Sequence, residues 1–191
     1  MTRILSGTVY QYAEDAVPNS PGNYFEIGVF NGLGFSEIAR KNPSKTCYAV
    51  DPFIEGGHTV ASSGVETGNK LNQQKLNFLD CTKDLSNVVL YETTSYNYSQ
   101  QLTDEQCNNM NISIVTIDGD HHYENVVIDF DIAVRLIGNK PGKIIVDDTD
   151  VVGVARAFEE FKVKFAHRII DEHRVVDHGS TQVLTLREQN D

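Results

Sequence analysis

The amino-acid sequence predicts a single α/β domain in which a doubly wound, mostly parallel sheet ends in an antiparallel hairpin. Short apolar runs alternate with longer amphipathic segments over most of the chain. Two further extended runs, separated by a polar turn, then close the sequence. A length of 191 residues suits one domain with a substantial core, so we expect residues 1–191 to form one unit.

Each predicted strand is a short run rich in Val, Ile, Tyr or Phe, and several of these runs end in an acidic residue or glycine. Such runs are typical of parallel strands that are buried on both faces. The runs are residues 24–29, 46–50, 87–91, 112–117 and 143–146. The closing pair, residues 168–176 and 181–186 around a turn at 177–180, predicts the antiparallel hairpin.

The clearest predicted helix covers residues 122–137, because apolar side chains recur there at helical spacing and strong stop signals follow at 138–142. A second helix is predicted over residues 151–165. Weaker candidates are residues 35–41, 70–80 and 98–106. The segment 54–69 is rich in Gly, Ser and Thr and poor in apolar residues, so it is either a surface loop or a lid over a substrate.

Composition excludes several classes of function. The formal net charge of −11 repels phosphate backbones and anionic lipids, so we expect neither a nucleic-acid substrate nor a membrane partner. No apolar stretch approaches the roughly 20 residues of a membrane span, and the first residues lack the pattern of a signal peptide. We therefore expect a cytoplasmic protein whose widely spaced Cys47, Cys81 and Cys107 are reduced thiols.

A glycine-rich turn follows the first predicted strand, with Glu26, Gly28, Asn31, Gly32 and Gly34 in sequence. Glycines allow a sharp bend and a close approach of a ligand to the main chain. The spacing differs from the dinucleotide fingerprint, and no Gly-Lys-Ser/Thr follows as in a phosphate-binding loop. An acidic residue in the turn disfavours a pyrophosphate and favours a cation or a ligand with an amino group and hydroxyls.

Asp51 ends the next predicted strand, about twenty residues further on, where a carboxylate can accept hydrogen bonds from both ribose hydroxyls. The ligand is therefore expected to be a positively charged nucleoside without phosphates. S-adenosylmethionine fits this description. Glu26, Gly28, Asn31, Gly32 and Asp51 are the candidate residues that hold it.

The segments 26–32 and 48–51 resemble the first and second motifs of class I methyltransferases, which have a Rossmann-like fold. This resemblance implies that the corner after the third strand lies beside the adenine. Thr94 and Ser95 are therefore candidate cofactor contacts. Alternatively, either residue serves only to cap the following helix.

Acidic residues follow the fourth and fifth predicted strands: Asp118 and Asp120 after one, Asp147 and Asp148 after the other. Ligands of open parallel sheets bind beyond the carboxyl ends of the strands, so these acids are expected in the cofactor crevice. Crowded carboxylates are costly unless a cation is present. Asp118, Asp147 and Asp148 could hold a divalent ion, with Mg²⁺ the usual choice and Ca²⁺ or Mn²⁺ left open. Asp118 is also a candidate cofactor contact.

Methyl transfer to oxygen needs a base, because a hydroxyl is a poor nucleophile until its proton leaves. His121 and Asp120 are the candidates, and His121 needs little tuning to act near neutral pH. A simpler reading also stands: Asp118 or Asp120 could cap the helix near 122, and Asp148 or Asp150 the helix near 151.

The segment 118–121 and the Asp147–Asp148 pair resemble signatures of metal-dependent sugar O-methyltransferases of the macrocin type and of the "methyltransferase 24" group. The resemblance spans residues 24–150. It implies that Asp118 and the paired acids bind metal, with Asp120 or His121 as the base. It also implies an enzyme that methylates a sugar or small polyol hydroxyl with S-adenosylmethionine.

Three alternatives remain: methylation of a catechol-like metabolite, a non-catalytic module that binds S-adenosylmethionine, and a nicotinamide-dependent oxidoreductase. Few residues precede the first predicted strand. Walls of the acceptor pocket are therefore expected from the segment 54–69 or from a neighbouring subunit of a homo-oligomer.

Overall fold

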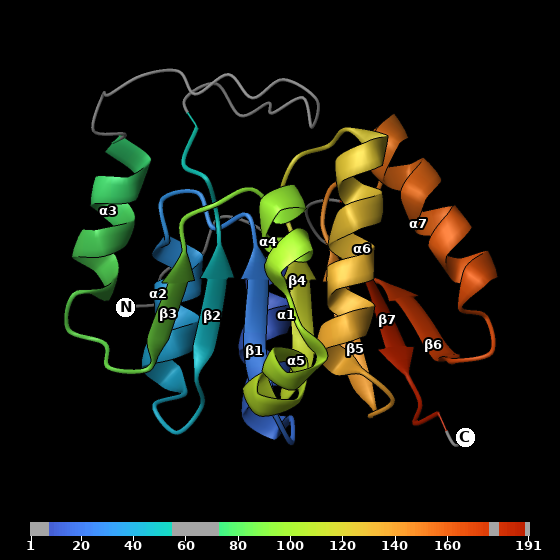
Figure 1. Ribbon diagram of the computed structural model, residues 1–191, viewed down its shortest axis with the longest axis horizontal. Coiled ribbons are helices and arrows are strands. Elements are labelled where there is room, and N and C mark those ends of the chain that lie inside the picture. Colours follow the sequence, from blue (N-terminus) through green and yellow to red (C-terminus); the bar gives the residue numbers. More distant parts are fainter. Residues whose placement is uncertain (1–7, 55–72, 176–179, 190–191) are drawn as a thin grey trace.

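A seven-stranded sheet runs through the protein in the order β3-β2-β1-β4-β5-β7-β6 (Figure 1). The computed structural model describes residues 8–54, 73–175 and 180–189. The strands are β1 (Asn23–Ile27), β2 (Cys47–Val50), β3 (Val88–Tyr91), β4 (Ile112–Ile117), β5 (Gly142–Val146), β6 (Ile169–Arg174) and β7 (Gln182–Leu186). Strands β1 to β5 pair in parallel, and β7 is antiparallel to both β5 and β6. The predicted α/β class is therefore confirmed.

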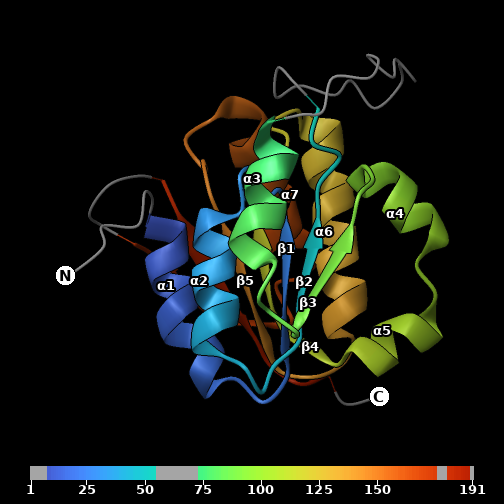
Figure 2. The ribbon, with the colours of Figure 1, turned by 90° about the vertical axis from the view of Figure 1, so that its left-hand side faces the viewer.

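Helices cover both faces of this sheet (Figure 2). On one face α1, α2 and α3 pack side by side, and on the other α4 and α5 lie against α6, which also contacts α7. Their bounds are α1 Thr8–Ala16, α2 Leu33–Lys41, α3 Gln73–Thr82, α4 Ser95–Gln101, α5 Asp104–Met110, α6 Tyr123–Ile137 and α7 Val152–Lys164. None of the helices in these described ranges combines the length and apolar character of a membrane span.

The core forms two apolar clusters, one on each face of the sheet, because successive strand residues point to opposite faces. In β1, Tyr24 joins the cluster under α1, α2 and α3, whereas Phe25 and Ile27 join the cluster under α4 to α7. All six residues of β4 are buried. Burial on both faces explains why the central strands read as continuous apolar runs rather than as alternating ones.

Most predicted elements agree with the structure to within a few residues at each end. The single helix predicted over residues 98–106 is wrong, since the chain there forms the separate helices α4 and α5. Thr103 starts the second one through a capping box: its side chain accepts from the Gln106 backbone N–H, and the Gln106 side chain accepts from the Thr103 N–H.

The prediction also missed α1 and the short 3-10 helix at Val17–Asn19. The segment predicted as a loop or lid at 54–69 lies, apart from residue 54, outside the described residues. So do the start of the helix predicted at 70–80 and most of the turn at 177–180.

Candidate active site

Loops from four strands meet at the carboxyl edge of the parallel sheet, which is the upper edge in Figure 1. These loops follow β1, β2, β4 and β5 and carry most of the residues that the sequence singles out. The edge lies at the reversal of strand order between β1 and β4, where open α/β sheets bind their ligands.

The glycine-rich turn after β1 is bent into conformations that suit glycine. Gly28 has φ +84°, and Gly32, the N-cap of α2, has φ +76°. A Cβ atom on Gly28 would lie 2.1 Å from the Asp118 carbonyl oxygen, so this turn packs directly on the loop after β4. The Asn31 side chain accepts a hydrogen bond from the Leu33 N–H at 3.2 Å. Packing within the chain thus accounts for two of the glycines.

Asp51 fixes this turn to the loop after β2. Its buried carboxylate accepts hydrogen bonds through Oδ2 from the Val29 and Phe30 N–H groups, both at 2.9 Å, and through Oδ1 from the Phe53 N–H at 2.6 Å. Burial raises the pKa of Asp51, and these three bonds lower it. A carboxylate has about four lone pairs, so Asp51 keeps limited capacity for the ribose hydroxyls expected from the sequence.

Glu26 lies beneath the turn and is fully buried. The Tyr24 hydroxyl donates to its Oε2 at 2.6 Å and the Tyr10 hydroxyl to its Oε1 at 3.0 Å. Burial raises the pKa of Glu26 to about 8, although the two tyrosines act to lower it. The sequence prediction missed Tyr10 because it missed α1, which carries this residue. Gly34 was the available signal, since a Cβ there would lie 2.3 Å from the Tyr10 ring.

The three acids predicted to bind metal come together. One carboxylate oxygen from each of Asp118, Asp147 and Asp148 lies within 4.8 Å of the others. Burial raises the pKa of Asp118 well above its usual value, and the charges of neighbouring acids, Asp147 first among them, raise it further. Hard oxygen donors at this spacing fit a divalent cation, which would relieve their mutual repulsion.

His121 lies beside this trio. Its Nε2 is 2.9 Å from Asp148 Oδ2, and Asp148 itself has a positive φ of 53°. Gly153 at the start of α7 allows this approach, because a Cβ there would lie 2.2 Å from the His121 carbonyl oxygen. On the other side of the trio, the Thr181 hydroxyl donates to Asp147 Oδ1 at 2.5 Å. The fold therefore holds a histidine against the acid cluster.

Asp120 makes local contacts at the start of α6. Its Oδ1 accepts from the His122 N–H at 2.8 Å and lies 2.5 Å from His122 Nδ1. The N-cap of α6 is His122, without a side-chain cap hydrogen bond, so the capping alternative is wrong for Asp120. It holds for Thr94, whose side chain accepts from the Asn97 N–H at the start of α4. Of the two candidate bases, His121 is therefore the one that contacts the acid trio, through Asp148.

Ser95 lies near a buried acid that the sequence reasoning did not single out. Asp129 on α6 is only 1% exposed, and neither of its carboxylate oxygens forms a hydrogen bond of ordinary geometry among the described residues. Burial raises its pKa to about 7, and the nearby Ser95 hydroxyl acts to lower it. Asp129 packs under Gly119, so it supports the loop that carries Asp118 and His121.

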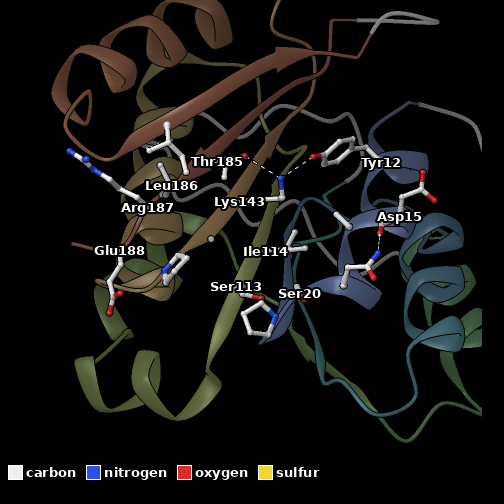
Figure 3. A pocket seen from close by; sticks show the side chains of 16 residues that line it. Tyr12, Asp15, Ser20, Ser113, Ile114, Lys143, Thr185, Leu186, Arg187 and Glu188 are labelled. Atoms are coloured by element: carbon white, nitrogen blue, oxygen red, sulfur yellow. Dashed lines mark hydrogen bonds between the residues drawn. The ribbon is translucent and has the colours of Figure 1, made fainter. Parts of the chain in front are cut away.

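A cavity of about 550 Å³ lies elsewhere, at the amino ends of β4 and β5 (Figure 3). In its wall the Lys143 Nζ donates to the Tyr12 hydroxyl at 3.2 Å and to Thr185 Oγ1 at 3.1 Å. None of the site residues predicted from the sequence lines this cavity. The residues able to perform chemistry are thus gathered at the opposite edge of the sheet.

Comparisons with known proteins identify the family of this chain. The sequence model of a family described as a methyltransferase domain matches residues 25–149. A protein of Acanthamoeba polyphaga mimivirus is 32% identical over 126 residues, which cover 65% of this chain and 50% of that protein. The chain therefore spans about half the length of the curated relative it matches.

Two solved structures share the fold. CalS11, a TDP-rhamnose 3'-O-methyltransferase of calicheamicin biosynthesis, has a TM-score of 0.64 and 17% identity, over 92% of this chain and 76% of its own. TomG from Streptomyces achromogenes, an O-methyltransferase of tomaymycin synthesis solved in complex with S-adenosylmethionine, has a TM-score of 0.64 and 12% identity, over 98% and 82%.

Proposed function

This chain belongs to the family of methyltransferase domains, and on that premise we propose that it methylates a hydroxyl oxygen of a sugar or similar small polyol. S-adenosylmethionine would be the methyl donor, and a divalent metal ion would assist. One observation carries the proposal: an acid trio and a histidine lie at the same edge of the sheet as the glycine-rich turn after β1, which packs on the loop that carries Asp118.

The cofactor would lie over the turn after β1, close to Gly28, Asn31 and Gly32. A cationic ligand suits this edge, because Glu26 and Asp51 give it negative charge when they are ionised. The remaining lone pairs of Asp51 would accept from the ribose. Thr94, Ser95 and Asp118 would border the adenine end.

Asp118, Asp147 and Asp148 would hold the metal ion, for which Mg²⁺ is the first choice. When bound, such an ion lowers the pKa of the acceptor hydroxyl and fixes its orientation. Asp148 would also orient His121: with the Nε2–H of His121 donating to Asp148, the ring nitrogen Nδ1 is left to accept a proton.

The proposed reaction is the transfer of a methyl group from S-adenosylmethionine to the acceptor oxygen, with His121 as the base. The acceptor oxygen attacks the methyl carbon of the sulfonium, the new C–O bond forms, and the electrons of the breaking S–C bond return to sulfur. The products are the methyl ether and S-adenosylhomocysteine. The hydroxyl proton passes to Nδ1 of His121.

The test is a methyl-transfer assay with labelled S-adenosylmethionine on a panel of nucleotide sugars, free polyols and catechols, each with and without EDTA. We expect turnover of a sugar or polyol that EDTA abolishes and added Mg²⁺ restores. The variant Asp147→Asn should fold normally by circular dichroism, yet lose Mg²⁺ binding in a calorimetric titration. Turnover indifferent to EDTA would contradict the metal role.

Three other outcomes would replace the proposal. Turnover of catechols alone would reassign the acceptor. Binding of S-adenosylmethionine without turnover of any acceptor, and with no effect of His121→Asn, would indicate a non-catalytic binding module. A titration that detects NAD binding and no S-adenosylmethionine binding would indicate a nicotinamide-dependent oxidoreductase instead.

A further inference from the structure

The cavity at the amino ends of β4 and β5 has the size and the lining of a binding site for a small organic molecule (Figure 3). Its volume of about 550 Å³ falls within the range of roughly 300 to 1,000 Å³ that is usual for ligand sites. Ile170 in its wall is 60% exposed, so part of the apolar lining meets solvent. The apolar residues of the walls are Ala16, Pro21, Ile114, Pro141, Ile170 and Leu186.

Three hydrogen-bond donors converge in one wall of this cavity. Lys143 Nζ lies between Tyr12 and Thr185 and donates to their hydroxyl oxygens at 3.2 and 3.1 Å (Figure 3). An ammonium group has three protons and a hydroxyl has one, so one N–H of Lys143 and both O–H groups still have a proton to donate. No group among residues 8–54, 73–175 and 180–189 accepts these three protons. The described part of the chain therefore supplies donors here without an acceptor.

The positive charge of Lys143 has no partner of opposite charge in the wall. Lys143 is half-buried, and no carboxylate of the described residues forms an ion pair with it. The other charged residues of the walls, Asp15, Arg187 and Glu188, are exposed, where water weakens their fields. A carboxylate has about four lone pairs, so one carboxylate would balance the ammonium charge and accept from all three donors.

We propose that this cavity binds a small apolar carboxylate, with its head group on Lys143, Tyr12 and Thr185 and its hydrocarbon part against the apolar walls. The formal net charge of −11 opposes a general attraction of anions, so binding depends on these local donors. The cavity and the acid trio lie at opposite edges of the sheet, which makes the cavity a second site rather than the place of the methyl acceptor. The inference does not depend on the proposed function.

Calorimetric titration of the whole chain with hexanoate, octanoate and decanoate tests the proposal. The affinity should rise with chain length, because each added methylene buries apolar area against the walls. The compounds 1-octanol and octylammonium keep the hydrocarbon chain of octanoate but not its negative charge, and they should bind at least about ten-fold more weakly. A decanoate that carries a photoreactive diazirine should label peptides of the cavity walls, which mass spectrometry of a digest identifies.

A matched pair of variants tests the role of the ammonium group. Lys143→Met should weaken octanoate binding by about ten-fold, because it removes the charge and one donor. Lys140→Met removes the same charge at the same edge of the sheet, where Lys140 Nζ donates to Asn111 Oδ1 and does not line the cavity. This control should leave the affinity within about two-fold, because water and salt screen its charge.

A second variant tests the site without removing any of the three donors. Ile170→Asp replaces an exposed apolar side chain of the wall with a negative charge, so it should fold normally and weaken octanoate binding. Thermal unfolding of each variant checks that the fold is intact, and Ile170→Asp decides the question if Lys143→Met does not fold.

Four results would overturn the inference. They are no binding of any of the three carboxylates, equal affinity for octanoate and octylammonium, the same affinity for octanoate in the folded variants as in the unmodified chain, or photolabelled peptides confined to the carboxyl edge of the sheet. None of these measurements involves S-adenosylmethionine or Mg²⁺. Failure of the proposed function would therefore leave this inference standing, and the reverse also holds.

Discussion

The two edges of the parallel sheet differ in how their polar groups are satisfied. At the carboxyl edge, acids on or directly after four strands lie close together, and burial and mutual repulsion raise the pKa values of Glu26 and Asp118. At the amino edge, cationic and amide side chains donate to backbone carbonyls of neighbouring segments. The carboxyl edge thus holds acids with raised pKa values, whereas polar side chains at the amino edge bridge neighbouring segments of the chain.

Two side chains illustrate the amino edge. Arg168 is 2% exposed and donates to the carbonyls of Gly138, Lys140 and Arg187 at 2.6 to 3.1 Å. The Asn87 side-chain amide donates to the Ala39 carbonyl in the last turn of α2 and to the Asn42 and Lys45 carbonyls in the turn that follows. Each group ties together loops that are distant in the sequence, so this edge stabilises the fold.

The backbone shows the same contrast. Phe30, Phe53 and Asp148 have φ values near +50° and lie in the loops after β1, β2 and β5. Residues other than glycine rarely adopt this conformation, and such strain persists where the surroundings enforce it. At the amino edge the corresponding residue is Asn111, a type that tolerates the left-handed region. We infer that contacts at the amino edge stabilise the fold, whereas the carboxyl edge costs folding free energy. Bound ligands are expected to offset that cost at the carboxyl edge.

The largest expected effect separates the two candidate bases at the carboxyl edge. His121→Asn should lower kcat by at least about 100-fold, since it removes the group that we propose as the proton acceptor. Asp120→Asn should cost far less, because an asparagine oxygen can still accept from the His122 N–H. Steady-state kinetics on the acceptor found in the panel decide between them, and the reverse order of effects would make Asp120 the base. The free energy of unfolding of His121→Asn should be nearly unchanged.

The second prediction concerns the cost of buried acids in the free protein. Glu26 has a pKa raised to about 8, so between pH 5 and pH 8 the folded state keeps a proton that the unfolded state has lost. The free energy of unfolding should therefore fall as pH rises through this window, by on the order of 2 kcal/mol from this residue. Urea unfolding at a series of pH values measures this dependence of the free energy of unfolding on pH. Glu26→Gln should flatten the dependence, and an unchanged slope would show that Glu26 is not its source.

The third prediction is that a substitution at the amino edge lowers stability and leaves activity unchanged, the opposite of the effect expected for His121→Asn. Arg168→Met should lower the free energy of unfolding by about 2 kcal/mol, because three backbone carbonyls lose the hydrogen bonds that the buried guanidinium donates to them. Its kcat at a temperature well below the unfolding transition should match that of the unmodified chain. Urea unfolding and kinetics on the same preparation test both statements. A variant with normal stability and reduced kcat would contradict the view that the amino edge serves stability and the carboxyl edge serves activity.

A structural feature could be predicted from the sequence when it depends on residues that are close together in the chain. The strands and the acids after them could be predicted, because apolar runs and acidic residues at strand ends are properties of contiguous segments. Asp118, Asp147 and Asp148 meet as expected, since the order of the parallel strands brings their ends together. The break between α4 and α5 was missed although Thr103 and Gln106 signal it.

Other features depend on packing between distant segments and leave little local trace. The engagement of Asp51 by three backbone N–H groups requires the turn after β1 to fold over the end of β2. The entry of Tyr10 into the site requires a helix whose position is set by contact with Gly34. In the sequence nothing distinguishes Asp129 from other polar residues of its helix, because its burial beneath Gly119 depends on the tertiary structure.

The smallest expected effect tests whether the cavity at the amino edge is independent of the active site. Lys143→Met keeps the length and apolar stem of the side chain but loses two hydrogen bonds to neutral hydroxyls and a contact with the Tyr12 ring. Because removing a half-buried charge partly offsets these losses, the free energy of unfolding should change by less than about 1 kcal/mol. Calorimetry should give unchanged affinities for S-adenosylmethionine and Mg²⁺. A clear change in either affinity would mean that the two edges communicate, and that stability and ligand binding are not divided between them.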